Sequence, residues 1–293
     1  MAIPTEVGVE RFFETSTWLD RVAIPIQDAV RNLFTRQGNF GLKARNFLNG
    51  VWLGHPLHAA ITDLPVGAWT SAMIFDYLGL ITGDRRLNRS ADLAVGIGLV
   101  GAIAAGLAGL ADYSEIEGES RRVGAVHGIL NLLGIVGFAL SMLRRMSRDR
   151  SGAIPLATLG YLATFVASDL GGMLVYHLGT EVSREAFITG PEQFVPVLPS
   201  DQLREGELRQ VNANGTSVLL TRVDNQIYAI DNTCTHWGCS LSEGELIDKS
   251  VKCHCHGSQF ALDNGSVING PATSPVATFD VRERNGQIEV RKR

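Results

Sequence analysis

The sequence predicts an α + β multidomain fold, in which a four-helix transmembrane bundle is followed by an all-β domain. Two observations predict it. Four long apolar stretches lie between residues 57 and 178, whereas the C-terminal third consists of short alternating segments separated by turn residues such as Asn214-Gly215. The chain of 293 residues has a formal net charge of −4, and its C-terminal third has no basic cluster. These charges argue against a nucleic acid as partner.

The four apolar stretches are each long enough to cross a bilayer. One of them, Leu93–Leu110, contains no charged residue and would span about 27 Å as a helix, against roughly 30 Å of hydrocarbon. Small residues recur at four-residue spacing (Gly98, Ala102, Gly106), which favours close helix contacts in lipid. A buried bundle of a soluble protein is the alternative, and four such stretches in succession argue against it. The predicted spans are Leu57–Ile81, Ala91–Ala111, Val123–Leu143 and Ala153–Leu178.

The segment before the first span has apolar residues near helical spacing, among them Phe12, Trp18 and Val22, and a predicted kink at Pro25. Two interpretations remain: an amphipathic helix that lies on the membrane surface, or a helix that caps the bundle. The predicted division of the chain is an amphipathic N-terminal segment (1–54), a four-span membrane domain (55–180), a linker (181–190) and the all-β domain (191–293).

The loops predict the orientation of this multi-pass protein in a cell membrane, where lipid is its first partner. The loops after the first and third spans contain seven arginines, against five basic residues on the other side. The positive-inside rule then places the arginine loops in the cytoplasm and the β domain on the extracytoplasmic face. Acidic residues such as Glu6 and Glu10 interrupt any cleavable signal sequence, so the first span must direct insertion.

Two short motifs of metal-binding residues lie in the β domain. Each supplies one cysteine and one histidine, whereas zinc fingers pair Cys with Cys and His with His along the chain. A mixed order suits a [2Fe–2S] cluster in which two cysteines hold one iron and two histidines the other. A Cys₂His₂ zinc site is the alternative. The two motifs are Cys234-Thr-His236 and Cys253-His-Cys-His256-Gly-Ser258.

Over residues 191–293 the sequence resembles a Rieske protein. The resemblance rests on C-T-H-W-G-C…C-H-C-H-G-S-Q-F, followed by Asn269-Gly-Pro271. It implies that a [2Fe–2S] cluster is held by Cys234, His236, Cys253 and His256. It also implies a disulfide between the remaining cysteines, Cys239 and Cys255, and two buried free thiols are the alternative.

The resemblance also implies roles for neighbouring residues. Ser258 is placed to donate its hydroxyl to a cluster sulfide, and Phe260 stands where high-potential members have a tyrosine donor. We therefore expect an intermediate reduction potential. His254 lies outside the family spacing and is expected to be a bystander. The ligands His236 and His256 are expected to be exposed, as the point where electrons leave and a partner docks.

A second group of polar residues is predicted at one membrane face, the face from which the β domain emerges. Three interpretations remain open for this group: a haem b with two histidine ligands, a quinone site that takes up protons, or a hydrogen-bonded polar cluster that fixes helix packing, with or without a metal ion. The residues of this candidate haem or quinone site are His58, His127, His177, Asp63 and Asp169.

Residues 50–180 are similar to a predicted four-helix membrane domain of unknown function that often accompanies Rieske domains, on the stretch Gly54–Pro65. That resemblance supplies no activity. Together the two parts predict a membrane-anchored electron-transfer protein that exchanges electrons between a membrane quinol or haem and a redox partner protein. No catalytic residue is assigned. The alternative is a redox-responsive binding or sensory module without steady electron flux.

Overall fold

The computed structural model describes residues 4–293, which form two compact units. The helical unit contains the described residues up to Gly41 and Leu57–Thr180, and the β unit contains Leu42–Pro56 and Glu181–Arg293. The β unit thus takes residues from both before and after the apolar helices. In a membrane, only an even number of crossings returns the chain to the side from which it started, so this composition fits four spans.

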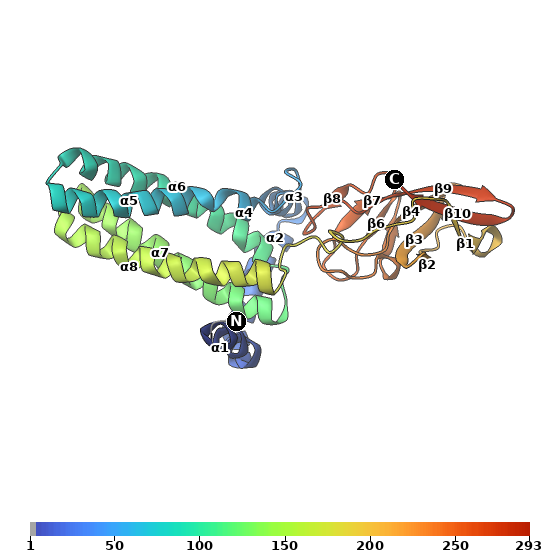
Figure 1. The fold of residues 1–293 in the computed structure, drawn as a ribbon, viewed down its shortest axis with the longest axis horizontal. Coiled ribbons are helices and arrows are strands. Elements are labelled where there is room, and N and C mark those ends of the chain that lie inside the picture. Colours follow the sequence, from blue (N-terminus) through green and yellow to red (C-terminus); the bar gives the residue numbers. More distant parts are fainter. Residues whose placement is uncertain (1–3) are drawn as a thin grey trace. The chain divides into compact units, whose positions relative to one another are not determined.

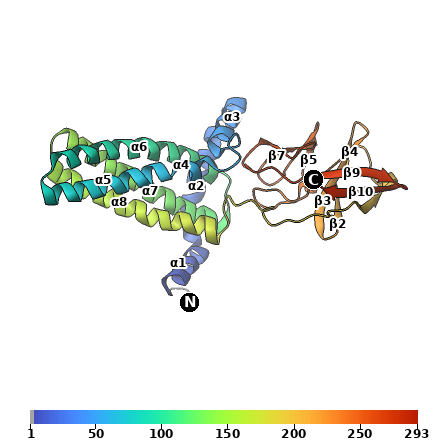
Figure 2. The same ribbon diagram turned by 45° about the horizontal axis from the view of Figure 1, so that its top comes forward.

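The helical unit is built on four helices that are long and apolar enough to cross a membrane, by length and composition. Figures 1 and 2 show α5, α6, α7 and α8 side by side along a common direction. The predicted four-helix bundle is confirmed. The first span joins α4 (Leu57–Ile61) to α5 (Asp63–Thr82), and the others are α6 (Arg85–Tyr113), α7 (Gly118–Met146) and α8 (Arg150–Gly172), which ends in the π turn η2 (Met173–His177).

Small residues allow the helices to approach closely, as their spacing predicts. Gly98 of α6 lies against the indole of Trp69, and a Cβ on Gly137 would lie 2.8 Å from Cα of Gly160. Trp69 also stacks on Phe138, with ring centroids 4.1 Å apart. In lipid, where apolar side chains gain little by leaving the solvent, such close packing holds helices together.

The outer surface of the bundle is apolar. Large side chains such as Leu93, Val100, Leu159 and Phe165 are exposed along the spans. Exposed apolar surface of this extent is unfavourable in water and is what a lipid-facing surface requires.

Helices α1 (Pro4–Thr15) and α2 (Asp20–Thr35) pack at the end of the bundle where α6 connects to α7 (Figure 2). Gln27 is buried, and its amide donates to the carbonyls of Tyr113 (2.8 Å) and Ile116 (2.6 Å). Phe12 and Trp18 remain exposed on the same segment. The segment therefore caps the bundle and still presents an apolar face.

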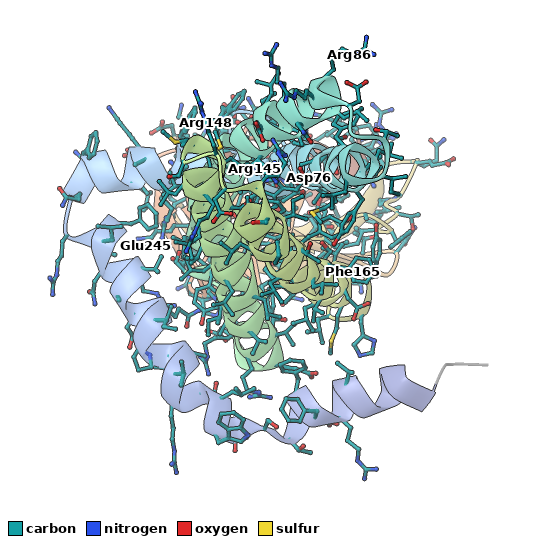
Figure 3. The ribbon with its side chains drawn as sticks, turned by 90° about the vertical axis from the view of Figure 1, so that its left-hand side faces the viewer. Asp76, Arg86, Arg145, Arg148, Phe165 and Glu245 are labelled. Atoms are coloured by element: carbon teal, nitrogen blue, oxygen red, sulfur yellow. A yellow bond between two sulfur atoms is a disulfide. The ribbon has the colours of Figure 1, made fainter. Side chains whose placement is uncertain are left out.

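A cluster of two arginines and two aspartates lies at the other end of the bundle, around Asp76 and Arg145 (Figure 3). Both carboxylate oxygens of Asp76 accept from the Arg145 guanidinium, and Arg150 adds a 2.7 Å bond. Asp92 accepts from Arg145 at 2.8 Å and from Arg150 at 2.6 Å. The sequence analysis treats Arg145 and Arg150 only as positive charges of a loop. In the structure the Arg145 side chain is 2% exposed, and its partner Asp76 is fully buried.

The β unit contains three antiparallel sheets, in the orders β1-β10-β9, β2-β3-β4 and β5-β6-β7-β8. Predicted turns connect the strands: Asn214, Asp224 and Asn285 have positive φ, as two-residue hairpin turns require. The strands are β1 (Val195–Pro199), β2 (Arg209–Ala213), β3 (Thr216–Val223), β4 (Gln226–Asp231), β5 (Glu245–Ile247), β6 (Ser250–Lys252), β7 (Gln259–Ala261), β8 (Val267–Asn269), β9 (Phe279–Arg284) and β10 (Gln287–Lys292). The all-β domain is confirmed.

Residues 42–56 belong to the same β unit, because the C-terminal part of α3 (Gly38–Asn49) packs against it. The Asn46 amide donates to Asn269 Oδ1 (2.9 Å), and its oxygen accepts from the Gly270 backbone N–H (3.0 Å). The predicted N-terminal segment 1–54 is thus divided between the two units.

Candidate metal centre

Two loops of equivalent conformation form the predicted metal site. In the first, the Gly238 N–H donates to the Cys234 carbonyl at 2.8 Å; in the second, the Gly257 N–H donates to the Cys253 carbonyl at 3.1 Å. Both glycines have φ of +80°, a conformation that side chains disfavour. Each loop therefore turns sharply after its cysteine.

The loops bring two cysteines and two histidines together. Cys234 and Cys253 are free thiols that are each 2% exposed, and the rings of His236 and His256 lie 5.0 Å apart at 82°. The backbone N–H groups of His236 and Trp237 point at the Cys234 sulfur, and those of Cys255 and His256 at the Cys253 sulfur. Such amides stabilise negative charge on sulfur, as metal-bound thiolates need.

Cys253 and His236 are held in the protonation states that metal binding requires, and Cys234 would lose its proton when a metal binds. A hydrogen bond from Cys234 lowers the pKa of Cys253 to about 6, and the same bond together with burial raises the pKa of Cys234. Burial, aided by the nearby His256, Arg184 and Arg45, lowers the pKa of His236 to about 3. Neither ring nitrogen of His236 has a hydrogen-bond partner among the described residues. Thiolate sulfur and neutral imidazole are the donors that a mixed-ligand [2Fe–2S] cluster takes.

A disulfide joins the two loops, between Cys239 and Cys255. The sulfurs of these residues and of Cys253 all lie within 4.8 Å of one another. Two of the three are bonded to each other, so this trio is a bridge placed against one ligand rather than a separate metal site. The disulfide ties the ligand loops together beside the site.

Comparison with known proteins agrees with this geometry. A family model described as the Rieske [2Fe-2S] domain matches residues 193–280. Ferredoxin CarAc of Metapseudomonas resinovorans is 35% identical over 98 residues, which cover 33% of this chain and 92% of the ferredoxin. The chain belongs to the Rieske [2Fe–2S] family. The ferredoxin component of the naphthalene 1,2-dioxygenase/salicylate 5-hydroxylase systems of Ralstonia sp is 32% identical, and the match covers 30% of this chain and 85% of that protein.

A solved structure, the ferredoxin of carbazole 1,9a-dioxygenase from Nocardioides aromaticivorans IC177, is 27% identical with a TM-score of 0.33, and the match covers 34% of this chain and 99% of that ferredoxin. A second family model, of a predicted membrane protein family (DUF2231), matches residues 54–184, which include the four apolar helices. The protein is thus a membrane protein with a Rieske domain, and the family implies a [2Fe–2S] cluster, which the four donors fit.

The Rieske loops are supported by a third loop, Asn269–Ala272. The Ala272 N–H donates to Ser258 Oγ at 3.0 Å, which leaves the buried Ser258 hydroxyl hydrogen available to donate elsewhere. Asn46 holds the same loop from the opposite end of the sequence. Asn46 is absent from the residues predicted for the site, and no local pattern could have found it, because its partners are more than two hundred residues away.

Phe260 is expected to limit the reduction potential. It is fully buried in the core that contains Cys234 and Cys253. Phe260→Tyr adds a hydroxyl donor there, and we expect the potential to rise by on the order of tens of millivolts within the roughly −150 to +300 mV of Rieske centres. Voltammetry of the full-length protein measures it. Phe260→Leu, which adds no donor, is the control, and an equal or lower potential for Phe260→Tyr would contradict this tuning.

The expectation that His236 is exposed is wrong. Its side chain is 1% exposed, and Glu181 Oε1 lies 3.9 Å from its Nε2. Arg184 lies beside His236, and its guanidinium is 5.5 Å from the centre of the Trp237 ring. The backbone N–H of Arg184 donates to the Thr235 carbonyl. The segment that follows the last span therefore covers this histidine. The side chain of His256 is partly exposed, although its Nε2 is buried.

The same segment contacts the Rieske domain through the partly buried Glu185, which lies near the buried Asp231. Glu185 accepts from the Ala277 N–H at 2.8 Å. Burial, and then the nearby Asp231, raise the pKa of Glu185 to about 8. Burial also raises the pKa of Asp231. Lys292 lies close enough to oppose both shifts in part. The hydrogen bond between Glu185 and Ala277 holds the segment against the Rieske domain.

We expect the stability of the β unit to fall as the pH rises from about 4.5 to about 8. The unfolded Glu185 loses its proton near 4.5 and the folded one near 8, so the folded state binds more protons in that window. Glu185→Gln should flatten this dependence. Thermal unfolding between pH 5 and 9, followed by the visible circular dichroism of the cluster, measures it. Glu192→Gln, which changes an exposed residue, is the control. If the stability of Glu185→Gln depended on pH as steeply as that of the wild type, the prediction would be wrong.

The structure brings two of the predicted membrane-site residues into contact. His58 and His127 lie together, with ring centroids 6.2 Å apart. Asp63 and Asp169 are exposed, so neither is placed to orient a buried imidazole. His177 is also exposed, at the end of η2. Outside this group, His254 lies exposed beside Glu243, with 3.8 Å between Nε2 and Oε2.

Proposed function

We propose that this protein is a membrane-anchored electron-transfer protein, whose Rieske cluster exchanges electrons between a membrane redox site, a quinol or haem, and a redox partner protein. The convergence of two buried thiols and two imidazoles in one disulfide-bridged pair of loops supports the proposal most directly. The cluster would supply one-electron chemistry. The four apolar helices supply the anchor.

The chemistry of the relatives supports a protein partner. Relatives matched in sequence include Ferredoxin CarAc and ferredoxin components of dioxygenase systems. We propose that this cluster likewise serves a partner redox protein. Because His236 is buried and His256 is partly exposed, the partner would dock on the His256 side of the loops.

We propose that the Rieske domain lies on the extracytoplasmic face. The seven arginines of the loops after the first and third spans support a cytoplasmic position for those loops. The Cys239–Cys255 disulfide supports an oxidising compartment for the other face. Intact cells treated with a membrane-impermeant thiol reagent test the orientation. The exposed Glu192→Cys should react and the exposed Arg148→Cys should not, whereas the reverse pattern would place the Rieske domain in the cytoplasm.

The function is tested by reducing the full-length protein in membranes with a short-chain quinol and recording the EPR spectrum of the cluster. The proposal expects a reduced Rieske signal, followed by reoxidation when an oxidised ferredoxin-type acceptor is added. Cys253→Ser, which lacks a ligand, is the control without a cluster. A protein that quinol leaves oxidised, and that binds a partner in only one redox state without turnover, would instead be a sensory module. One zinc ion with negligible sulfide would overturn the cluster itself.

A further inference from the structure

Two histidines lie close together inside the helical unit, and each contacts a backbone carbonyl of a neighbouring helix. His58 of α4 has its Nδ1 2.8 Å from the carbonyl of Ala105 in α6. His127 of α7 has its Nδ1 2.8 Å from the carbonyl of Ala167 in α8. The first two spans and the last two spans thus each form a helical hairpin in which a histidine on the first helix contacts a carbonyl on the second.

A glycine makes each contact possible. Gly109 follows Ala105 by four residues, and Gly171 follows Ala167 by four, so each lies one helical turn beyond the carbonyl. A Cβ on Gly109 would be 2.9 Å from Nδ1 of His58, and one on Gly171 would be 3.2 Å from Cε1 of His127. The same Ala-x-x-x-Gly pattern therefore opens a space for an imidazole in both hairpins.

The carbonyl contacts fix the tautomer of both rings. A carbonyl oxygen only accepts, so each Nδ1 is protonated and each Nε2 of a neutral ring has a free electron pair. At His127 this agrees with Asn131, whose amide lies 3.0 Å from Nε2 and 3.1 Å from the His127 carbonyl, both of which accept. Histidines that bind metals are held in this way, with the other ring N–H donated to a backbone carbonyl.

The separation of the rings suits a shared metal. Their centroids are 6.2 Å apart and their planes cross at 85°. With metal–nitrogen bonds of roughly 2.0 Å, two imidazoles on opposite sides of one metal have centroids roughly 6 Å apart. Polar side chains inside a membrane domain are costly, and one hydrogen bond to each ring would fix helix packing without bringing the rings together. Their convergence is the observation that a packing role leaves unexplained.

We propose that His58 and His127 are the nitrogen ligands of a second metal centre, which takes a first-row transition metal either as a free ion or as haem iron. Binding requires Asn131 to release Nε2 of His127, while its bond to the His127 carbonyl can remain. Metal binding at this pair is independent of the proposed function. Its use as the membrane redox site rests on that function.

The test uses full-length protein in mild detergent, with metal, haem and sulfide measured per chain before and after incubation with Fe²⁺, Cu²⁺, Zn²⁺ or haemin. The variants His58→Gln and His127→Gln retain a donor for the carbonyls but lose the imidazole. We expect the wild type to bind about one metal equivalent beyond the cluster, and each variant to lose it while its cluster iron, sulfide and EPR signal remain. His55→Gln, which removes an exposed histidine, should lose nothing.

A Soret band that disappears in both variants identifies haem iron, and metal without a Soret band identifies a free ion. Far-ultraviolet circular dichroism and size-exclusion elution show whether each variant is folded. If a variant fails to fold, the double variant Cys234→Ser with Cys253→Ser, which holds no cluster, should still bind the second equivalent.

Wild-type protein that binds no metal beyond the cluster, or folded variants that bind as much as the wild type, would overturn the site. A wild type that binds the second metal but shows no Rieske signal would instead count against the proposed function and leave this site standing. The two proposals therefore fail in distinguishable ways.

Discussion

Asp76→Ala will lower the free energy of unfolding of the helical unit by about 3–5 kcal/mol. Asp76 is fully buried and accepts from both Arg145 and Arg150. Its removal leaves two guanidinium groups with one carboxylate, Asp92, and one of these groups is 2% exposed. The pair of positive charges would then be only half neutralised, which is costly because water does not solvate a buried charge.

Denaturation in mixed detergent micelles, followed by helical circular dichroism, measures this loss. Arg86→Ala is the matched control: this arginine is 90% exposed in its pair with Asp84, so its removal should leave the stability nearly unchanged (Figure 3). The double variant Asp76→Leu with Arg145→Leu leaves Arg150 and Asp92 balanced, so it should be more stable than Asp76→Ala. If Asp76→Ala were as stable as Arg86→Ala, the network would contribute no stability.

Removal of the disulfide, by Cys239→Ala with Cys255→Ala, is expected to lower the stability of the β unit by about 3 kcal/mol, from the chain entropy of a loop of this length. The bridge closes a sequence separation of 16 residues. Both ligand loops are tied by it, so their opening would expose the thiolates and release iron. We therefore expect the cluster to be lost faster as well as the unit to unfold sooner.

The half-life of the cluster on heating, followed by its visible absorbance, measures the second effect. The wild type treated with a thiol reductant should approach the variant, whereas the variant should not respond to the same reductant. A cluster that persists equally long in both proteins would show that the loops hold their geometry without the bridge.

The spans, the hairpins and the ligand motifs could be predicted because each depends on residues that are close together in the sequence. A run of apolar residues such as Leu93–Leu110 specifies a helix in lipid whatever lies around it. Asp224-Asn225 specifies a tight turn because both residues tolerate positive φ. The spacing of Cys234 and His236 is enough to indicate a metal site.

The contacts that join distant segments could not be predicted in this way. The pairing of Asp76 with Arg145 depends on which helices are neighbours, and no spacing within one helix reports it. The burial of His236 depends on Glu181 and Arg184, in a segment that composition alone marks as a linker. The exposure of Asp169 depends on the rotation of α8, which a nearly uniform apolar sequence does not specify.

The hydrogen bonds of Asn46 have a consequence for biogenesis. Asn46 leaves the ribosome before the first membrane helix, and its partners Asn269 and Gly270 leave after the last one. The loop beside the cluster thus acquires these bonds only when all four helices have been synthesised and both flanking segments have reached one compartment. A chain inserted with a helix missing would leave Asn46 across the bilayer from that loop, so these two hydrogen bonds form only in a correctly inserted chain.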